Sequence, residues 1–146
     1  MATMRIWPPV WTALFIALAF AAAQFWQFGN AETIFVGWLL ISLSVVISLW
    51  SVYVLRKSMT TVLPDREPAA LVTRGPFALS RNPIYAADCL AVVGFAFAFR
   101  QPFAALLAIP LGMILQRAFI RTEEERLYKA FGRVYQAYAS NVRRWL

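Results

Sequence analysis

Four long apolar runs limit what this chain can fold into more than any other feature of its sequence. They cover residues 8–28, 34–55, 84–99 and 103–119. The first two are each about 20 residues long, the length at which an α-helix crosses the ~30 Å hydrocarbon core of a bilayer. Hydrophobic residues make up 61% of the 146 residues, which is more than a soluble domain of this size could bury. We therefore expect an all-α, polytopic membrane protein with four transmembrane helices, folded as a single domain over residues 1–146.

The ends of the apolar runs predict how the helices are connected. The first run ends in the bulky residues 24–27, whereas a signal-peptide cleavage site needs small residues, so we expect this helix to be retained. Only residues 100–102 separate the third run from the fourth, which predicts a helical hairpin. Pro102 suits the first turn of the fourth helix, and Pro110 should kink that helix.

The basic residues between the runs predict the orientation in the membrane. Residues 29–33 contain no Lys or Arg, and the hairpin turn contains only Arg100. The segment between the second and third runs is basic and contains Arg56, Lys57, Arg66, Arg74 and Arg81. Because short cytoplasmic segments are enriched in Lys and Arg, we expect residues 56–83 to form a cytoplasmic loop and both termini to be cytoplasmic.

The same composition excludes several classes of function. The net charge is +7, but the Lys and Arg residues sit in short segments beside apolar runs, which is typical of membrane flanks and not of a nucleic-acid groove. The chain contains no His, so a His-ligated metal site and a Ser-His-Asp triad are impossible. The single Cys89 allows no internal disulfide. We expect the lipid bilayer as a partner, and neither a metal nor a nucleic acid.

The sequence changes character after the fourth run. Apolar residues recur at spacings of three and four among charged residues, at Leu127, Phe131, Val134, Tyr135 and Tyr138. This pattern predicts an amphipathic cytoplasmic helix over residues 122–141 that lies at the membrane surface. Its first turn contains the acidic cluster Glu123, Glu124 and Glu125. Such residues stabilise the positive end of a helix dipole, but they could equally bind a ligand.

A second informative segment precedes the third run. Residues 69–85 read AALVTRGPFALSRNPIY, in which Gly75-Pro76 and Asn82-Pro83 predict two turns. Pro83 is well placed to begin the third helix. Taken alone, this segment is an ordered loop with aromatic membrane anchors.

Together, the two segments resemble the isoprenylcysteine carboxyl methyltransferase family, which is related to membrane phospholipid methyltransferases. The resemblance rests on LVTRGPF, then SRNPIY before a helical hairpin, then RTEEERLYKAFGRVYQAY, and it covers roughly the C-terminal half of the chain in detail. It implies methyl transfer from S-adenosylmethionine to a lipophilic substrate that enters from the membrane, such as an isoprenylcysteine carboxylate.

The resemblance also implies a set of cofactor-binding residues. These are Ala69, Ala70, Leu71, Val72, Phe77, Arg81, Asn82, Pro83, Ile84, Tyr85, Glu123 and Glu124. Aligning the helix on Phe131-Gly132 makes Glu123 and Glu124 the acidic pair of the family, whereas a gapped alignment moves the pair along the acidic run to include Glu125. Carboxylates could accept hydrogen bonds from the donors of S-adenosylmethionine and offset its positive charge.

Two further charged residues are candidates for a catalytic role. Asp88 lies within the third run, where an unpaired carboxylate is costly, so we expect it to face the bundle interior and contact substrate or cofactor. Arg117 lies near the cytoplasmic end of the fourth run. It either positions an anionic substrate group or extends its side chain to the membrane surface as an anchor.

The sequence leaves other functions open. A phospholipid amine or a small hydrophobic thiol would suit an apolar substrate tunnel as well as an isoprenylcysteine. A non-catalytic scaffold that has kept the fold is also possible, since fold alone does not establish activity. Three departures from the family pattern favour the scaffold, namely Asn82 in place of His, Phe77 in place of Tyr and Ala87 in place of Gly.

Overall fold

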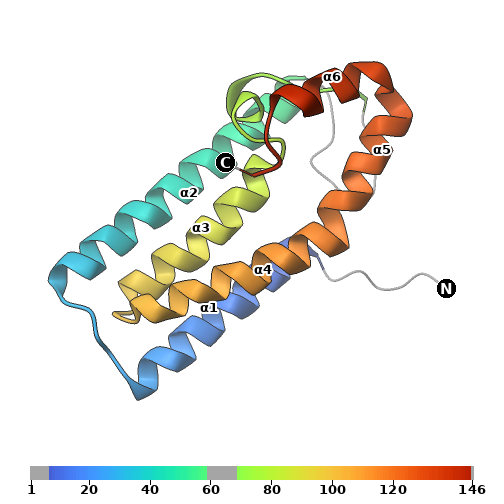
Figure 1. Ribbon diagram of the computed structural model, residues 1–146. Helices are drawn as coiled ribbons and strands as arrows, with labels where there is room; N and C mark the ends of the chain where they lie inside the picture. The colour runs from blue at the N-terminus through green and yellow to red at the C-terminus, as the bar shows by residue number, and fades with distance from the viewer. Residues whose placement is uncertain (1–6, 59–68, 146) are drawn as a thin grey trace. The chain divides into compact units, whose positions relative to one another are not determined.

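The computed structural model describes residues 7–58 and 69–145, and this part of the chain is helical without any strand. The middle of the predicted loop 56–83, including Arg66, lies outside the described residues. Figure 1 shows the elements in chain order from blue to red. They are α1 (Pro8–Phe25), α2 (Ala31–Lys57), the 3₁₀-helix η1 (Gly75–Ala78), α3 (Pro83–Ala98), the 3₁₀-helix η2 (Pro102–Leu107), α4 (Ala108–Leu115), the π-helix η3 (Gln116–Ile120), α5 (Arg121–Phe131) and α6 (Arg133–Asn141).

Three helical stretches of the described residues are long and apolar enough to cross a membrane. They are Pro8–Phe25, Ala31–Lys57 and Pro102–Phe131. The helix Pro83–Ala98 is also apolar, but it has 16 residues, which corresponds to about 24 Å at 1.5 Å per residue. The all-α fold is therefore confirmed along the described chain, with three candidate membrane-spanning helices, and the count of four spans stays a prediction.

The boundaries of the first two helices follow from local capping. Pro8 begins α1, where its missing N–H has no helical partner to lose. Asn30 caps α2, because its side-chain oxygen accepts a hydrogen bond from the backbone N–H of Thr33 at 3.0 Å. The second helix therefore begins at Ala31, earlier than the predicted 34–55, and it ends with the basic residues Arg56 and Lys57 in its last turn.

The contacts divide the chain into two compact units, which we describe separately. The first unit consists of Met1–Ser44 and Asp88–Met113, and the second of Val45–Ala87 and Ile114–Leu146. The first unit therefore contains α1, η2 and parts of α2, α3 and α4. The second contains η1, η3, α5 and α6, together with the remaining parts of α2, α3 and α4.

Glycine lets α2 and α3 approach each other closely in the first unit. A Cβ atom added to Gly37 would lie 2.3 Å from the backbone nitrogen of Ala98 and 2.7 Å from the carbonyl oxygen of Gly94. These are backbone atoms, which cannot move aside as a flexible side chain can. A second apolar cluster joins α1 to the start of η2 through the buried residues Ala19, Ala96 and Ala104. Small side chains thus set the helix spacing of this unit.

The two turns of the first unit are hydrogen-bonded to each other. The carbonyl oxygen of Arg100 accepts hydrogen bonds from the backbone N–H groups of Phe28 and Gly29, both at 2.9 Å. The Arg100 guanidinium donates to the carbonyl oxygen of Gly29 at 2.8 Å, and the Gln101 side chain donates to that of Trp26 at 2.9 Å. The turn between α1 and α2 therefore lies beside the turn between α3 and η2, and the predicted hairpin turn at residues 100–102 is present.

The fourth apolar run belongs to a longer helical stretch than predicted. Helix continues from Pro102 to Phe131, through a 3₁₀ segment, α4, a π-helix and α5. Pro110 lies in the first turn of α4, where the 3₁₀ segment gives way to α-helix. The kink expected at Pro110 stays a prediction.

The predicted amphipathic helix 122–141 is interrupted, and this part of the prediction was wrong. Helix α5 ends at Phe131 and α6 begins at Arg133, so the chain bends between them at Gly132 (Figure 1). Gly132 has φ 51° and ψ −122°, a conformation that residues with a Cβ atom rarely adopt. The apolar periodicity continues across this residue, so the periodicity alone did not reveal the break.

Candidate functional site

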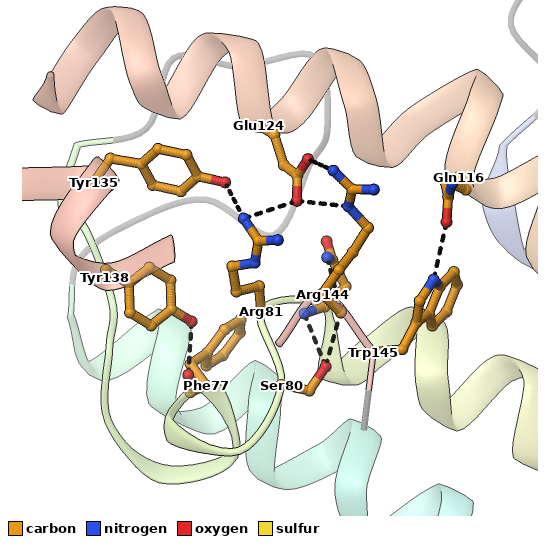
Figure 2. A network of polar contacts seen from close by, with 10 residues as sticks. Phe77, Ser80, Arg81, Gln116, Glu124, Tyr135, Tyr138, Arg144 and Trp145 are labelled. Carbon is orange, nitrogen blue, oxygen red and sulfur yellow. Dashed lines mark hydrogen bonds and ion pairs between the residues drawn. The ribbon is translucent and has the colours of Figure 1, made fainter. Parts of the chain in front are cut away.

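The loop before α3 is shaped by the two predicted turns. Gly75 has φ +62°, and Pro76 follows it in the first turn of η1. The backbone N–H groups of Leu79 and Ser80 both donate to the carbonyl oxygen of Pro76, at 3.1 Å. After this compact turn, the Arg81 side chain reaches Glu124 of α5 and Tyr135 of α6 (Figure 2).

Three charged side chains meet at the centre of the second unit. Arg144 donates from Nε to Oε1 of Glu124 at 3.0 Å and from Nη2 to Oε2 at 2.6 Å, which is a two-point contact. Arg81 Nη1 lies 3.3 Å from the same Oε1. The side chains of Glu124 and Arg81 are only 14% and 16% exposed, so water screens this pair weakly, whereas the Arg144 side chain is 35% exposed. Figure 2 shows both guanidinium groups pointing at the Glu124 carboxylate.

Residues 142–145, which we call the return segment, come back from α6 to the loop before α3. The backbone N–H of Arg81 donates to the carbonyl oxygen of Arg143 at 2.8 Å. The carbonyl oxygen of Arg144 accepts from the side chains of Asn82, at 3.1 Å, and Ser80, at 3.3 Å. The Asn82 side chain, predicted to bind a cofactor, therefore donates to the backbone of the chain itself.

Two tyrosines of α6 join the loop to the charged cluster. Tyr138 donates its hydroxyl hydrogen to the carbonyl oxygen of Phe77 at 2.6 Å, and Arg81 donates to the Tyr135 hydroxyl at 3.5 Å. Burial raises the pKa of Tyr138 to about 12, since a tyrosinate would lose its hydration there. Burial also raises the pKa of Tyr135, and the Glu124 carboxylate adds to this effect. Both hydroxyl groups are therefore protonated at neutral pH, with Tyr138 as a donor and Tyr135 as an acceptor in these contacts.

A second acidic residue pairs with the predicted Tyr85. The Tyr85 hydroxyl donates to Oε1 of Glu123 at 2.7 Å, and the Tyr85 ring stacks on Phe119 with ring centroids 6.4 Å apart. The two halves of the sequence motif, 38 residues apart, thus meet at this hydrogen bond. Glu125 is exposed, whereas Glu123 and Glu124 are half-buried.

The π-helix η3 lies immediately before these acids. Such segments are rare and occur frequently at functional sites. Gln116 in its first position accepts a hydrogen bond from the indole N–H of Trp145 at 3.0 Å (Figure 2). Phe119 and Ile120, at its other end, are buried. The return segment is thus held at Trp145 as well as at Arg144.

The remaining predicted residues have different surroundings. Val72 and Pro83 are buried, Ala70, Leu71, Phe77 and Ile84 are half-buried, and Ala69 is exposed. Arg117 lies in η3 and is also exposed. Asp88 is half-buried and belongs to the first unit, where the Thr12 side chain of α1 is its hydrogen-bond partner.

Four residues of these contacts were not predicted from the sequence, namely Ser80, Gln116, Arg144 and Trp145. Arg144 and its neighbour Arg143 read as a basic membrane flank. Nothing in the local pattern shows that the half-buried Arg144 pairs with Glu124 while the side chain of Arg143 is exposed. The Glu124 contact also raises the pKa of the Arg144 guanidinium above its usual value. The cluster of acidic residues after the fourth run did indicate that basic partners would be found, because clustered carboxylates need cationic partners.

Comparison with known proteins identifies a family for this chain. Residues 32–134 match the model of the phospholipid methyltransferase family. The chain is also similar to the nickel-cobalt-cadmium resistance protein NccN of Alcaligenes xylosoxydans xylosoxydans, with 29% identity over 129 residues. That alignment covers 86% of this chain but only 56% of the relative, so the chain spans about half the length of that protein. No solved structure matches the chain.

The matched region contains all but the first residue of α2, the loop, α3, the whole helical stretch to Phe131, and both predicted acids. Because the family model covers more than half of the sequence, this protein is a member of the phospholipid methyltransferase family, the group related to isoprenylcysteine carboxyl methyltransferases.

Proposed function

We propose that this protein transfers the methyl group of S-adenosylmethionine to a lipophilic acceptor at the interface between membrane and cytoplasm. The observation that carries the proposal is the hydrogen bond between Tyr85 and Glu123, because it joins the two segments that resemble the methyltransferase family. Membership of the phospholipid methyltransferase family supports the reaction class.

The residues of the second unit fit such a cofactor. S-adenosylmethionine combines a sulfonium and an amino group with a carboxylate, so its site needs both acceptors and cationic donors. Glu123 and Glu124 provide acceptors. Arg81 provides a donor, since its buried Nε has no hydrogen-bond partner among the described residues. A buried donor that the protein itself leaves unsatisfied is the group that a ligand would be expected to fill.

The cofactor itself would supply the activated methyl group. The protein has to hold it, orient it and exclude water. In this proposal Tyr85 fixes the rotamer of Glu123, which accepts hydrogen bonds from the cofactor and offsets its positive charge. Residues 69–72, Phe77 and the segment Arg81 to Tyr85 surround the remainder of the molecule.

Arg117 and Asp88 are proposed to act on the acceptor. Arg117 is exposed in η3, close in sequence to the acids, and would position an anionic group such as a carboxylate. Asp88 would offer a polar contact within the membrane, with Thr12 holding its carboxylate in place. An isoprenylcysteine carboxylate, a phospholipid amine and a small hydrophobic thiol are all acceptors of the required character.

Both termini are proposed to be cytoplasmic, with α3 as a fourth span. The basic residues of the 56–83 segment and the C-terminal region support this orientation. The paired turns of the first unit support it as well, since the α1–α2 and α3–η2 connections lie side by side.

Titration of the detergent-purified protein with S-adenosylmethionine tests the proposed function. Wild-type protein should bind it saturably. Glu123→Gln keeps the size of the side chain and removes its charge, so the affinity should fall about tenfold or more, as expected for a lost hydrogen bond from a charged group. The melting temperature of the cofactor-free variant should stay nearly unchanged.

Glu125→Gln is the matched control, because it makes the same change at an exposed neighbour. Its affinity should stay within about twofold of wild type, a difference that corresponds to only ~0.4 kcal/mol. A larger loss at Glu125 would show that the gapped alignment is right. Absence of binding by the wild-type protein would favour the non-catalytic scaffold.

A further inference from the structure

The cluster around Glu124 has an excess of positive charge. The guanidinium groups of Arg81 and Arg144 both contact a single carboxylate, that of Glu124. The two guanidinium groups thus share one negative charge. Because Arg81 is only 16% exposed, water hydrates its charge poorly. An anion bound there would complete the cluster.

A specific atom shows where the anion would bind. The Nε of Arg81 is buried and has no hydrogen-bond partner among residues 7–58 and 69–145. The other end of the same guanidinium is engaged, through Nη1, by Glu124 and Tyr135. An Arg side chain is a rigid planar group, so fixing Nη1 also fixes the direction in which Nε donates.

We propose that Arg81, Glu124 and Arg144 form the subsite for the amino-acid group of S-adenosylmethionine, with Arg144 as a positioning residue. This inference rests on the proposed function. Arg81 Nε donates to the cofactor carboxylate, which is the only anionic group that S-adenosylmethionine carries. Glu124 offers acceptor capacity to the amino group beside it. Arg144 contacts neither group and acts through Glu124.

The role of Arg144 follows from the geometry of guanidinium–carboxylate pairs. An Arg and a carboxylate prefer to form two parallel hydrogen bonds. Here Glu124 forms that two-point contact with Arg144, at 3.0 and 2.6 Å, and only a single contact with Arg81. Without Arg144, Glu124 would be free to pair through both oxygens with Arg81 and to occupy its Nε. Arg144 therefore keeps the Arg81 donor available to a ligand.

The return segment holds Arg144 in place independently of its side chain. Its carbonyl oxygen accepts from Asn82 and Ser80, and the next residue, Trp145, donates to Gln116. Replacing the Arg144 side chain should thus leave the course of the backbone intact. The neighbouring Arg143 provides a matched control, because its side chain is exposed and its carbonyl contact to Arg81 does not depend on the side chain.

The experiment compares two ligands that differ only at the amino-acid group. S-adenosylhomocysteine carries the amino and carboxylate groups, whereas methylthioadenosine lacks both. Each is titrated into purified wild-type protein, Arg144→Ala, Arg144→Lys and Arg143→Ala. For Arg144→Ala we expect an affinity loss of about tenfold or more for S-adenosylhomocysteine and less than about twofold for methylthioadenosine. Arg143→Ala should bind both ligands as wild type does.

Arg144→Lys keeps the charge but replaces the two-point contact by a point charge. It should bind S-adenosylhomocysteine with an affinity between those of wild type and Arg144→Ala. If Arg144→Ala does not fold, this variant carries the test alone, and a selective loss for S-adenosylhomocysteine is still expected.

The outcomes separate this inference from the proposed function. If the wild-type protein binds neither ligand, the proposed function fails. If it binds both, but the Arg144 variants lose affinity for both ligands equally, Arg144 has only a structural role and the inference is wrong. The inference is also wrong if the Arg144 variants bind both ligands as tightly as Arg143→Ala.

Discussion

The two units of this protein hold their helices together by different means. In the first unit, helices meet through small residues and backbone atoms, as at Gly37 and Ala98, and the two turns are joined through the Arg100 carbonyl oxygen. In the second unit, charged and aromatic side chains meet, as where Glu124 pairs with Arg144 and where Tyr85 donates to Glu123.

The difference corresponds to what each unit has to do. Close packing at glycine needs only complementary shape. This suits helices surrounded by lipid, because an apolar side chain gains little free energy by contacting a neighbouring helix instead of acyl chains. A polar network fixes the direction of each donor and acceptor, which is what a binding site requires before its ligand arrives. The first unit is thus held mainly by close packing, and the second contains the polar network of the proposed cofactor site.

The strongest test of the first unit concerns its paired turns. Reporters inserted near Asn30 and at Arg100 should both read on the side opposite the cytoplasm, and a reporter fused after Leu146 should read cytoplasmic. The result is all or none, because a helix either crosses the membrane or does not. If α3 did not cross, the Asn30 and Arg100 reporters would fall on opposite sides, which would also contradict the hydrogen bonds between the two turns.

A substitution at Gly37 should have the next largest effect. In Gly37→Leu the new side chain would collide with the backbone of α3, so we expect a stability loss of more than about 3 kcal/mol and poor recovery of folded protein. Recovery in detergent by size-exclusion chromatography measures this. Ser42→Leu makes a similar gain in size at an exposed position of α2 and should be tolerated. Normal folding of Gly37→Leu would show that the helices do not pack this closely.

In the second unit, stability should depend on Glu124 and not on its neighbours. Glu124→Gln leaves two guanidinium groups without their shared carboxylate. The expected loss is about 2 kcal/mol, between the ~0.5 kcal/mol of exposed ion pairs and the ~4 kcal/mol of fully buried ones. The melting temperature of the ligand-free protein should fall by about 5 °C. Equal melting of Glu124→Gln and Glu125→Gln would indicate that the cluster does not hold the unit together.

Substitution of Tyr138 should have the smallest effect on stability, and this effect depends on alkaline pH. Its pKa in the folded protein is raised to about 12, above the value of about 10 expected for an unfolded chain. Its contribution to stability is therefore fully present below about pH 10 and is lost as the pH rises through about 12. Tyr138→Phe removes the hydrogen bond to Phe77, costs about 1 kcal/mol at neutral pH and should flatten this alkaline decline.

Denaturant unfolding at a series of pH values measures the alkaline effect of Tyr138. Tyr128→Phe, which removes an exposed tyrosine, is the control. If Tyr138→Phe lost stability between about pH 10 and 12 as steeply as the control does, the buried hydroxyl would not be the cause.

Much of the architecture could be predicted because it depends on local pattern. The length of each apolar run predicts a helix, and Pro8, Pro83 and Pro102 mark three helix starts because proline lacks the N–H that a first turn does not use. The family resemblance also depended on local motifs, and the family match over residues 32–134 confirms it.

The local sequence pattern did not predict the one residue of this region whose backbone dihedral angles interrupt the helix. Gly132 interrupts a periodicity that reads as one helix, because the residues on both sides keep the same apolar spacing. A left-handed glycine changes the direction of the chain without changing the pattern, so the break could be seen only in three dimensions.

The sequence by itself determined that this is a helical membrane protein with an acidic cluster after its last apolar run, since hydrophobicity and helix periodicity act over neighbouring residues. Only the tertiary structure decided what each acid contacts. Glu124 pairs with Arg144 across 20 residues, and Glu123 accepts a hydrogen bond from Tyr85 across 38. Ion pairs and hydrogen bonds require two groups within about 3 Å of each other, and for distant residues that proximity exists only once the chain has folded.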